Sequence, residues 1–369
     1  MSPRAIDRYL EQLDHEEVLL RRGQRSGLYT FVAVHCTLRG PALGGCRLWS
    51  YHDSRAALRD AMRLSRAMTY KAAVADLPLG GGKGVIMVPS GGLSPRQRRD
   101  ALLDFGDAVA AVGGKYITAE DVGTSSRDMG VIAQRTKHVA GLSRRRGGSG
   151  DPSPFTALGV ESAIRACCER VFSTASLRGR SVCVIGLGHV GSRVAKRCAQ
   201  AGAKVLASDV DPAKRQIATR LGARWVQPER ALVVGVDVLA PCALGGIFDE
   251  QTVPDLKCAV IAGAANNQLA TDKIAELIAA RQILWAPDFV VNAGGIINIA
   301  EELVLYDPVV AQRRVRGIAD TLGRIFDEAH AAQTTPLRAA MELARKRLAV
   351  AGSGDGGQRA PAPATASRS

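Results

Sequence analysis

Three glycines after an apolar run could bind the phosphates of a dinucleotide. Gly186, Gly188 and Gly191 form the pattern G-x-G-x-x-G directly after the strand-like segment SVCVIG and before a helix-like segment. The first glycine permits the turn, the second lets the backbone approach a pyrophosphate, and the third lets helix and strand pack closely. We therefore expect a dinucleotide site here, with His189 and Val190 in the same turn.

A carboxylate follows at the end of the next predicted strand. Asp209 lies 23 residues after Gly186, where the fingerprint uses an acidic side chain to accept hydrogen bonds from the adenosine ribose. A carboxylate at this place also repels the 2'-phosphate of NADP. The expected cofactor is therefore NAD. Lys214 and Arg215 lie just beyond and could soften this preference, but they do not remove the carboxylate.

Seven strings in the sequence carry a family resemblance. In chain order they are PALGGCRL, MTYKAAVADLPLGGGKGVI, TAEDVGTS, GDPSPFTALGV, GLGHVGSRVAK, AGAANNQLA and DFVVNAGGIIN. Together they resemble the leucine, phenylalanine and valine dehydrogenases of the glutamate dehydrogenase superfamily, from about residue 28 to about residue 350. The resemblance implies an enzyme that uses NAD to deaminate an L-amino acid reversibly to its 2-oxo acid and ammonia.

The resemblance also assigns roles to three charged residues. Lys71 corresponds to the lysine that binds the substrate carboxylate, Lys83 to the lysine that drives the chemistry, and Asp121 to the catalytic aspartate that relays a proton to and from the amino group. An amino acid presents a carboxylate that needs a fixed cation, and its deamination needs a base near neutral pH. A lysine can act as that base only where burial or a cationic neighbour lowers its pKa to about 7 to 8.

The remaining site positions follow from the same resemblance. The side-chain pocket is expected to be apolar, which favours leucine, isoleucine and valine, and its walls are Leu43, Ala119, Ile296 and Ile299. The other expected substrate contacts are Gly44, Met68, Asn266 and Asn292. The expected contacts to the nicotinamide end of the cofactor are Ala264, Asn266 and Asn292.

Two kinds of local pattern are expected to position these residues in a first domain. Tyr29–Cys36 is rich in β-branched and aromatic residues and predicts a buried strand. From Asp53, a plausible N-cap, apolar residues recur at helical spacing and predict a helix that carries Lys71 on its C-terminal side. The stretch PLGGGKG is expected to form a glycine-rich loop around Lys83, followed by a strand over 85–88.

A second domain is expected after the segment GLSRRRGGSGDPSPF, because a concentration of Gly, Pro and Ser marks loops and domain boundaries. Strands expected from 181 and at 236–240, 259–262 and 283–286 alternate with helical segments. This alternation predicts a doubly wound parallel sheet. A helix that begins at Thr335 and Pro336 and ends near Leu348 is expected to return to the first domain.

The sequence therefore predicts an α/β protein of two domains. The first is an N-terminal α/β substrate and oligomerisation domain over 1–143, joined by the helix at about 331–351. The second is a Rossmann-type NAD-binding domain over 144–330, and the active site is expected in the cleft between them. Residues 352–369 have a composition that predicts a disordered tail.

Composition narrows the alternatives. A formal net charge of +14 could indicate nucleic-acid binding, but the arginines are spread along the chain and aromatic residues are only 4%, so nucleic acid is not the expected partner. No apolar run reaches the roughly 20 residues that span a bilayer, and the charged N-terminus does not resemble a signal peptide. The eight cysteines show no metal-binding spacing. We expect a cytoplasmic homo-oligomer without a metal.

Several other functions stay open at this point. A phenylalanine dehydrogenase is the main alternative, and a glutamate dehydrogenase is disfavoured because the expected pocket offers no cation for a second carboxylate. A catalytically silent NAD-binding or nucleic-acid-binding protein is the alternative from another class. Loss of Lys83 or Asp121 would favour it, and both residues are present.

Overall fold

The computed structural model describes residues 14–243, 245–304 and 306–353, which form two compact units. The first unit contains the residues up to Asp151, Ile299–Asp307 and the residues from Ala344 onward, and the second contains Pro152–Asn298 and Pro308–Leu343. The chain thus leaves the first unit inside the segment rich in Gly, Pro and Ser. None of the helices among these described residues is long and apolar enough to cross a membrane.

The first unit is built on a mixed sheet of five strands in the order β1-β2-β4-β3-β5. Strands β1 and β2 and strands β2 and β4 pair antiparallel, whereas β3 pairs parallel with both β4 and β5. The strands are β1 (Glu17–Arg22), β2 (Tyr29–Cys36), β3 (Ala42–Ser50), β4 (Gly80–Val88) and β5 (Tyr116–Glu120). The helices are α2 (Ser54–Val74), α3 (Pro95–Ala111) and α4 (Ser126–Ile132).

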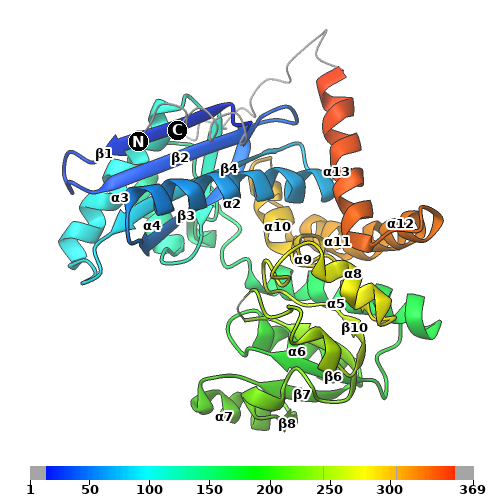
Figure 1. Cartoon of the computed structure of the whole chain (residues 1–369). Helices are drawn as coiled ribbons and strands as arrows, with labels where there is room; N and C mark the ends of the chain where they lie inside the picture. The colour runs from blue at the N-terminus through cyan, green and yellow to red at the C-terminus, as the bar shows by residue number, and fades with distance from the viewer. Residues whose placement is uncertain (1–13, 244, 305, 354–369) are drawn as a thin grey trace. The chain divides into compact units, whose positions relative to one another are not determined.

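Side chains on β2 alternate between two apolar layers, because successive residues of a strand point to opposite faces. Phe31 and Ala33 pack with α2, and Val32 and Val34 pack with the layer that contains Phe105 of α3. The predicted buried strand Tyr29–Cys36 is therefore confirmed and covered on both faces. Figure 1 shows α2 running along the sheet.

Helix α2 begins where the sequence predicts. The Asp53 carboxylate accepts a 2.7 Å hydrogen bond from the backbone N–H of Ala56, as an N-cap does. The helix continues for 21 residues and ends at Val74, so that Lys71 lies in its last turn. Its buried face consists of small and apolar residues such as Ala57, Ala61 and Met62, which let the helix lie close to the sheet.

The second unit contains a parallel sheet of six strands in the order β11-β10-β9-β6-β7-β8. The strands are β6 (Ser181–Ile185), β7 (Lys204–Ser208), β8 (Arg224–Trp225), β9 (Val236–Pro241), β10 (Cys258–Ile261) and β11 (Leu284–Trp285). After β8 the chain returns to the other side of β6. The strand order therefore reverses between β6 and β9, at the position where doubly wound sheets bind ligands beyond their carboxyl ends.

Helices connect these strands and follow them. They are α5 (Ser153–Phe172), α6 (Gly191–Gln200), α7 (Arg215–Arg220), α8 (Ile274–Ala280), α9 (Asp288–Val291), α10 (Gly294–Glu302), α11 (Pro308–Arg316), α12 (Ile318–Ala331) and α13 (Pro336–Ser353). Thr335 caps α13 as predicted, because its hydroxyl accepts a hydrogen bond from the N–H of Arg338. Helices α10 and α13 each have residues in both units.

The structure adds one detail to the sequence interpretation and corrects another. Within the segment GLSRRRGGSGDPSPF, Arg144–Arg146 form a 3-10 turn, and Arg146 donates to the carbonyl of Gly130. Helix α13 continues to Ser353, so Gly352 and Ser353 are helical and not part of a tail. The rest of the predicted tail lies outside the described residues.

Candidate functional site

Lys83 and Asp121 form a close ion pair in the first unit. Lys83 lies on β4 and is only 5% exposed, and Asp121 directly follows β5. The Nζ atom of Lys83 donates a 2.7 Å hydrogen bond to Oδ2 of Asp121. The structure thus brings together the two residues that the sequence assigns to catalysis, although 38 positions separate them.

The prediction of a glycine-rich loop around Lys83 is wrong, because the segment Gly80–Val88 is a strand. The glycines are needed because helices pack closely on both faces of this strand. A Cβ atom on Gly81 would collide with the backbone nitrogen of Thr69 on α2, and one on Gly84 would collide with the ring of Phe105 on α3. Helices therefore approach this strand closely from both faces, and Lys83 is held on a rigid element.

Two further glycines bring β3 against the ion pair. A Cβ atom on Gly44 would collide with the carbonyl oxygen of Gly82, and one on Gly45 would lie 2.6 Å from the Cβ atom of Asp121. The phenol of Tyr116 donates a 2.6 Å hydrogen bond to the Gly44 carbonyl from the interior. Gly44, expected beside the substrate, thus lies on the strand next to Lys83.

Arg47 is a member of this cluster that the sequence analysis did not single out. Its Nε atom donates to Oδ2 of Asp121 at 3.1 Å, and its Nη1 atom donates to Oδ2 of Asp60 at 2.8 Å. Asp60 lies on α2 and also accepts hydrogen bonds from the hydroxyl of Tyr51 and from Arg63. Arg47 is inside the quoted string PALGGCRL, two residues after Gly45, and strand alternation places both on one face.

Thr124 is a second residue that was missed, and it fixes the turn after β5. Its hydroxyl accepts a 2.9 Å hydrogen bond from the N–H of Asp121 and donates at 2.8 Å to the carbonyl of Cys46. The signal for it was the string TAEDVGTS, in which a hydroxyl residue three positions after an Asp favours a side-chain-stabilised turn.

The charges around Asp121 keep its carboxyl group ionised. Burial by itself would raise the pKa of Asp121, but the positive charges and hydrogen bonds of Lys83 and Arg47 outweigh it and hold that pKa below its ordinary value. A half-buried carboxylate next to an ammonium group can accept a proton from a bound amino group and return it. This arrangement suits proton transfer at an amine.

The remaining substrate positions of the first unit lie on neighbouring elements. Leu43 and Ala119 are buried on β3 and β5, and Leu43 pairs with Gly81 of the lysine strand. Lys71 and Met68 are half-buried on α2. These positions therefore lie on β3, β5 and α2, which belong to the same unit as the strand of Lys83.

The glycine turn of the second unit has the form expected for a dinucleotide site. Gly186 follows β6 with φ +97°, in the left-handed region that favours glycine. A Cβ atom on Gly191 would collide with the carbonyl oxygen of Gly186, whereas one on Gly188 would meet open space. Gly188 and His189 are exposed, Val190 is half-buried, and α6 begins at Gly191. The backbone turn is therefore accessible to a pyrophosphate at a helix N-terminus.

Asp209 contacts this turn directly. Its Oδ2 atom accepts a 2.6 Å hydrogen bond from the N–H of Leu187, and its Oδ1 atom accepts one from the N–H of Asp211. Each carboxylate oxygen has a second lone pair, so both can still accept a bond from a ribose hydroxyl. Asp209 therefore orients the glycine turn as well as offering acceptors for the ribose.

The expected nicotinamide-end residues also come together. The buried Asn292 donates from Nδ2 to the carbonyl of Ala264 at 3.1 Å and to Oδ1 of Asn266 at 2.6 Å. Gln268, which the sequence analysis missed, is fully buried and donates to the carbonyls of Gly263 and Ala265. This segment after β10 is thus held in one conformation by side-chain amides.

Ile296 and Ile299 are both buried on α10. Ile296 belongs to the second unit and Ile299 to the first. Their place beside Leu43 and Ala119, and the cleft between the domains, stay predictions.

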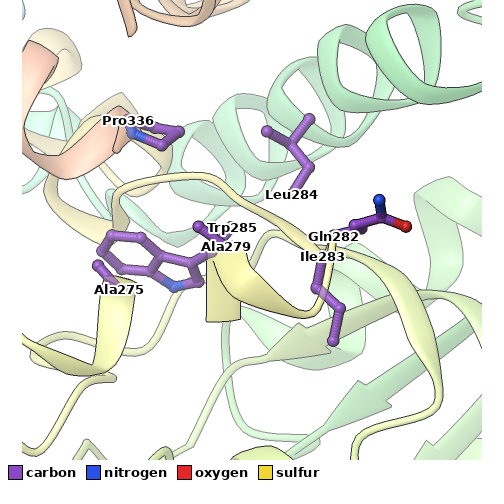
Figure 2. A pocket seen from close by; sticks show the side chains of 7 residues that line it. All are labelled: Ala275, Ala279, Gln282, Ile283, Leu284, Trp285 and Pro336. Atoms are coloured by element: carbon purple, nitrogen blue, oxygen red, sulfur yellow. The ribbon is translucent and has the colours of Figure 1, made fainter. Parts of the chain in front are cut away.

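A pocket of about 220 Å³ in the second unit shares no residue with the predicted site. Figure 2 shows its lining, which comes from α8, β11 and the start of α13 and includes Trp285 and Pro336. The indole N–H of Trp285 donates to Oε1 of Gln268. One residue of the pocket lining thus contacts the segment after β10, and none of the lining residues belongs to the glycine turn.

The cysteines behave as small apolar residues. All eight are free thiols, and six of them are buried. Within the described residues no three His, Cys, Asp or Glu side chains gather in the way that a metal ion would need.

Family comparisons match both units. Residues 15–138 match the model described as "Glu/Leu/Phe/Val dehydrogenase, dimerisation domain", and residues 210–356 match "Glutamate/Leucine/Phenylalanine/Valine dehydrogenase". Residues 162–241 match the NAD-binding domain of D-isomer specific 2-hydroxyacid dehydrogenases.

Individual proteins match over nearly the whole chain. A leucine dehydrogenase of Thermoactinomyces intermedius is 40% identical over 92% of both chains. A valine dehydrogenase of Streptomyces virginiae is 42% identical over 92% of this chain and 95% of its own. The crystal structure of an L-tryptophan dehydrogenase from Nostoc punctiforme superposes with a TM-score of 0.81 at 36% identity, covering 94% of this chain and 99% of that one.

Proposed function

Because the chain belongs to the glutamate, leucine, phenylalanine and valine dehydrogenase family and is an NAD-dependent amino-acid dehydrogenase, we propose that it deaminates a branched aliphatic L-amino acid to the 2-oxo acid and ammonia. The observation that carries the chemistry is the ion pair of the buried Lys83 and the half-buried Asp121, 2.7 Å apart. The observation that favours an aliphatic side chain is the burial of Leu43 on β3, the strand next to that of Lys83, and of Ala119 on β5, the next strand in the sheet.

Each charged residue has a distinct role in the proposed reaction. Lys71 binds the substrate carboxylate through its charge. Asp121 accepts a proton from the substrate ammonium and stabilises the cationic imine that forms when Cα loses its hydride. Lys83 removes a proton from the water that attacks this imine, and Asp121 returns its proton to the nitrogen of the resulting carbinolamine. The C–N bond then breaks, ammonia leaves, and the hydroxyl proton and the proton on Lys83 pass to solvent. NAD, when bound, supplies the hydride acceptor.

The residues that would hold the cofactor lie in the second unit. The N–H groups of the turn at Gly186, Gly188 and Gly191 would bind the pyrophosphate, and Asp209 would bind the adenosine ribose. Asn266 and Asn292, whose side-chain amides are hydrogen-bonded to each other, would contact the nicotinamide ribose. A Cβ atom on Gly188 would meet open space, which supports this fit.

The apolar walls predict which substrates are rejected. A dicarboxylate would place a charged group against Leu43 and Ala119, and burying a charge without a counter-charge is costly. Glutamate is therefore expected to be nearly inactive. Aromatic substrates are the second candidate, because one structural relative is named an L-tryptophan dehydrogenase.

A panel of amino acids tests the proposal. Purified protein is incubated with NAD and L-valine, L-leucine, L-isoleucine, L-phenylalanine, L-tryptophan or L-glutamate, and the absorbance of reduced cofactor is followed. We expect the highest kcat/KM for the three aliphatic substrates, with modest differences among them. Highest kcat/KM for an aromatic substrate would refute the aliphatic assignment, and no turnover of any of them would refute the activity.

We also propose that the enzyme is a homo-oligomer. The family model that covers β1 to β5 is described as a dimerisation domain, and β1 lies at the edge of its sheet. An edge strand presents unpaired backbone groups to another chain, and Leu20 on β1 is half exposed. Light scattering after size exclusion would give the mass in solution, and a monomer would contradict this proposal.

A further inference from the structure

Arg47 connects the site to helix α2 through two carboxylates. It donates to Asp121 through Nε and to Asp60 through Nη1. We propose that Arg47 is a positioning residue that supplies a constant positive charge to Asp121 while the charge on Lys83 changes during turnover. This inference rests on the proposed function.

The two cations on Asp121 differ in chemistry although they bond the same oxygen. Lys83 and Arg47 both donate to Oδ2. A lysine that acts as a base must be neutral in part of the cycle, whereas the guanidinium of arginine keeps its charge in proteins. When Lys83 is neutral, Arg47 is the cation that still balances the Asp121 carboxylate.

Such a charge is needed because Asp121 is in a poorly solvated place. An unbalanced, poorly solvated carboxylate is costly and would take up a proton from the substrate or from solvent. A protonated Asp121 could not accept the proton of the substrate ammonium. The permanent charge of Arg47 therefore keeps the proton acceptor ready at each step.

Arg47 is held rigidly enough for this role. Asp60 accepts hydrogen bonds from Arg47 at 2.8 Å and from the Tyr51 hydroxyl at 2.7 Å. A guanidinium fixed by two carboxylates keeps its Nε atom aimed at Asp121. Arg63 makes the matched control, since it contacts the same Asp60 from an exposed position without contacting Asp121.

Four other titratable groups of the described residues lie around Asp121, and none of these four is a cation. Burial raises the pKa values of the Cys46 thiol and the Tyr116 phenol well above their ordinary range, so both stay neutral. Glu120, next in sequence, is acidic and accepts from Ser126. Asp128 is paired with Arg98 at 2.8 Å.

The sign of the effect on pH follows from these charges. Burial raises the pKa of Asp121 and the charges of Lys83 and Arg47 lower it. Removal of Arg47 leaves burial opposed by Lys83 alone, so the pKa of Asp121 must rise. Since Asp121 acts as a carboxylate, the acidic limb of the kcat profile moves to higher pH.

The experiment compares Arg47→Gln, Arg47→Lys and Arg63→Gln with the unaltered enzyme, using an accepted amino acid and saturating NAD. For Arg47→Gln we expect kcat to fall roughly 10- to 100-fold and the acidic limb to rise by about one pH unit. Arg47→Lys keeps the charge but cannot bond both carboxylates in the same way, so intermediate values are expected. Arg63→Gln should leave both quantities nearly unchanged.

Each outcome decides a separate question. No turnover by the unaltered enzyme refutes the proposed function. An active enzyme in which Arg47→Gln lowers kcat without moving the acidic limb refutes the charge role and leaves a structural one. If Arg47→Gln does not fold, Arg47→Met, which keeps an unbranched apolar stem without the charge, carries the test, and an acidic limb identical to that of Arg63→Gln overturns the inference.

Discussion

Gly82 lies directly against the ring of Tyr116, and a Cβ atom at this glycine would come within 2.5 Å of the Cδ2 atom of that ring. Tyr116 is fully buried and its hydroxyl is bonded to the Gly44 carbonyl, so the ring cannot move aside without breaking that bond. The absence of a side chain at Gly82 therefore allows the Tyr116 ring to pack directly against β4.

Gly82→Ala is expected to destabilise the protein by about 1 to 3 kcal/mol, the usual range for overpacking a core. Urea unfolding at neutral pH measures this change. Gly91→Ala is the control, because no atom lies within 4 Å of the added methyl group, and its effect should stay within about 0.5 kcal/mol. Equal effects of the two substitutions would contradict the packing argument.

The Gly-rich segment shows why part of the site was predicted and part was not. Local patterns are enough to predict α2 from Asp53 and the turn at Gly186, because caps and turns depend on neighbouring residues. Consecutive glycines also suggest a loop, and only the approach of Thr69 and Phe105 from other elements explains why they form a strand. Arg47 was missed for the same reason, since its partners Asp60 and Asp121 are distant in sequence.

Substitution of Lys83 or Asp121 should strongly lower kcat and leave the affinity for NAD nearly unchanged. Lys83→Ala and Asp121→Asn are expected to lower kcat by about 100-fold to 10,000-fold, the usual contribution of a general acid or base. NAD affinity, measured by calorimetry, should change little because both residues lie in the other unit. Lys115→Ala is the control lysine substitution, and near-native turnover of Lys83→Ala would disprove the mechanism.

Lys71→Ala should act differently from these two substitutions. It removes the proposed cation for the substrate carboxylate, so the substrate KM should rise by about tenfold or more. A kcat decrease with an unchanged KM would argue against carboxylate binding by Lys71.

Asp209→Ser is expected to raise the KM for NAD and to reduce the preference of the enzyme for NAD over NADP. The substitution removes a ribose acceptor and the repulsion of the 2'-phosphate, and it also leaves the Leu187 N–H without its carboxylate partner. Kinetics with both cofactors measure the ratio of the two kcat/KM values. Asp211→Asn, outside the glycine turn, should keep the original ratio, and an unchanged ratio for Asp209→Ser would refute the role of this residue.

Stability should decrease as pH falls from about 6.5 to about 4 because of His35. Burial, with the nearby charges of His15 and Arg66, lowers the pKa of His35 to about 4. In the unfolded chain the pKa of His35 is near 6.5, so between pH 6.5 and pH 4 the unfolded chain binds more protons than the folded chain. The contribution of His35 to the free energy of unfolding is therefore complete above pH 6.5 and is lost as the pH falls to 4. The loss from this group should be about 1 to 3 kcal/mol.

Urea unfolding at pH 7.5 and pH 5, for the unaltered protein and for His35→Gln, separates this group from the others. His35→Gln should weaken the pH dependence. His52→Gln should not, because the His52 side chain is 83% exposed. Identical pH slopes for all three proteins would show that His35 does not control acid stability.

Substrate choice should respond most directly to Leu43. This side chain is 1% exposed on β3 and pairs with Gly81 beside Lys83, so we place it at the wall of the side-chain pocket. Leu43→Ala removes three carbon atoms from that wall and leaves room for a ring. Because each methylene group is worth about 1 to 3 kcal/mol in such a pocket, the ratio of kcat/KM for phenylalanine to that for leucine should rise by at least about tenfold. Leu48→Ala, on the same strand, should lower stability and keep the ratio. If Leu43→Ala left the phenylalanine-to-leucine ratio unchanged, Leu43 would not line the substrate pocket, and the aliphatic preference would need another structural cause.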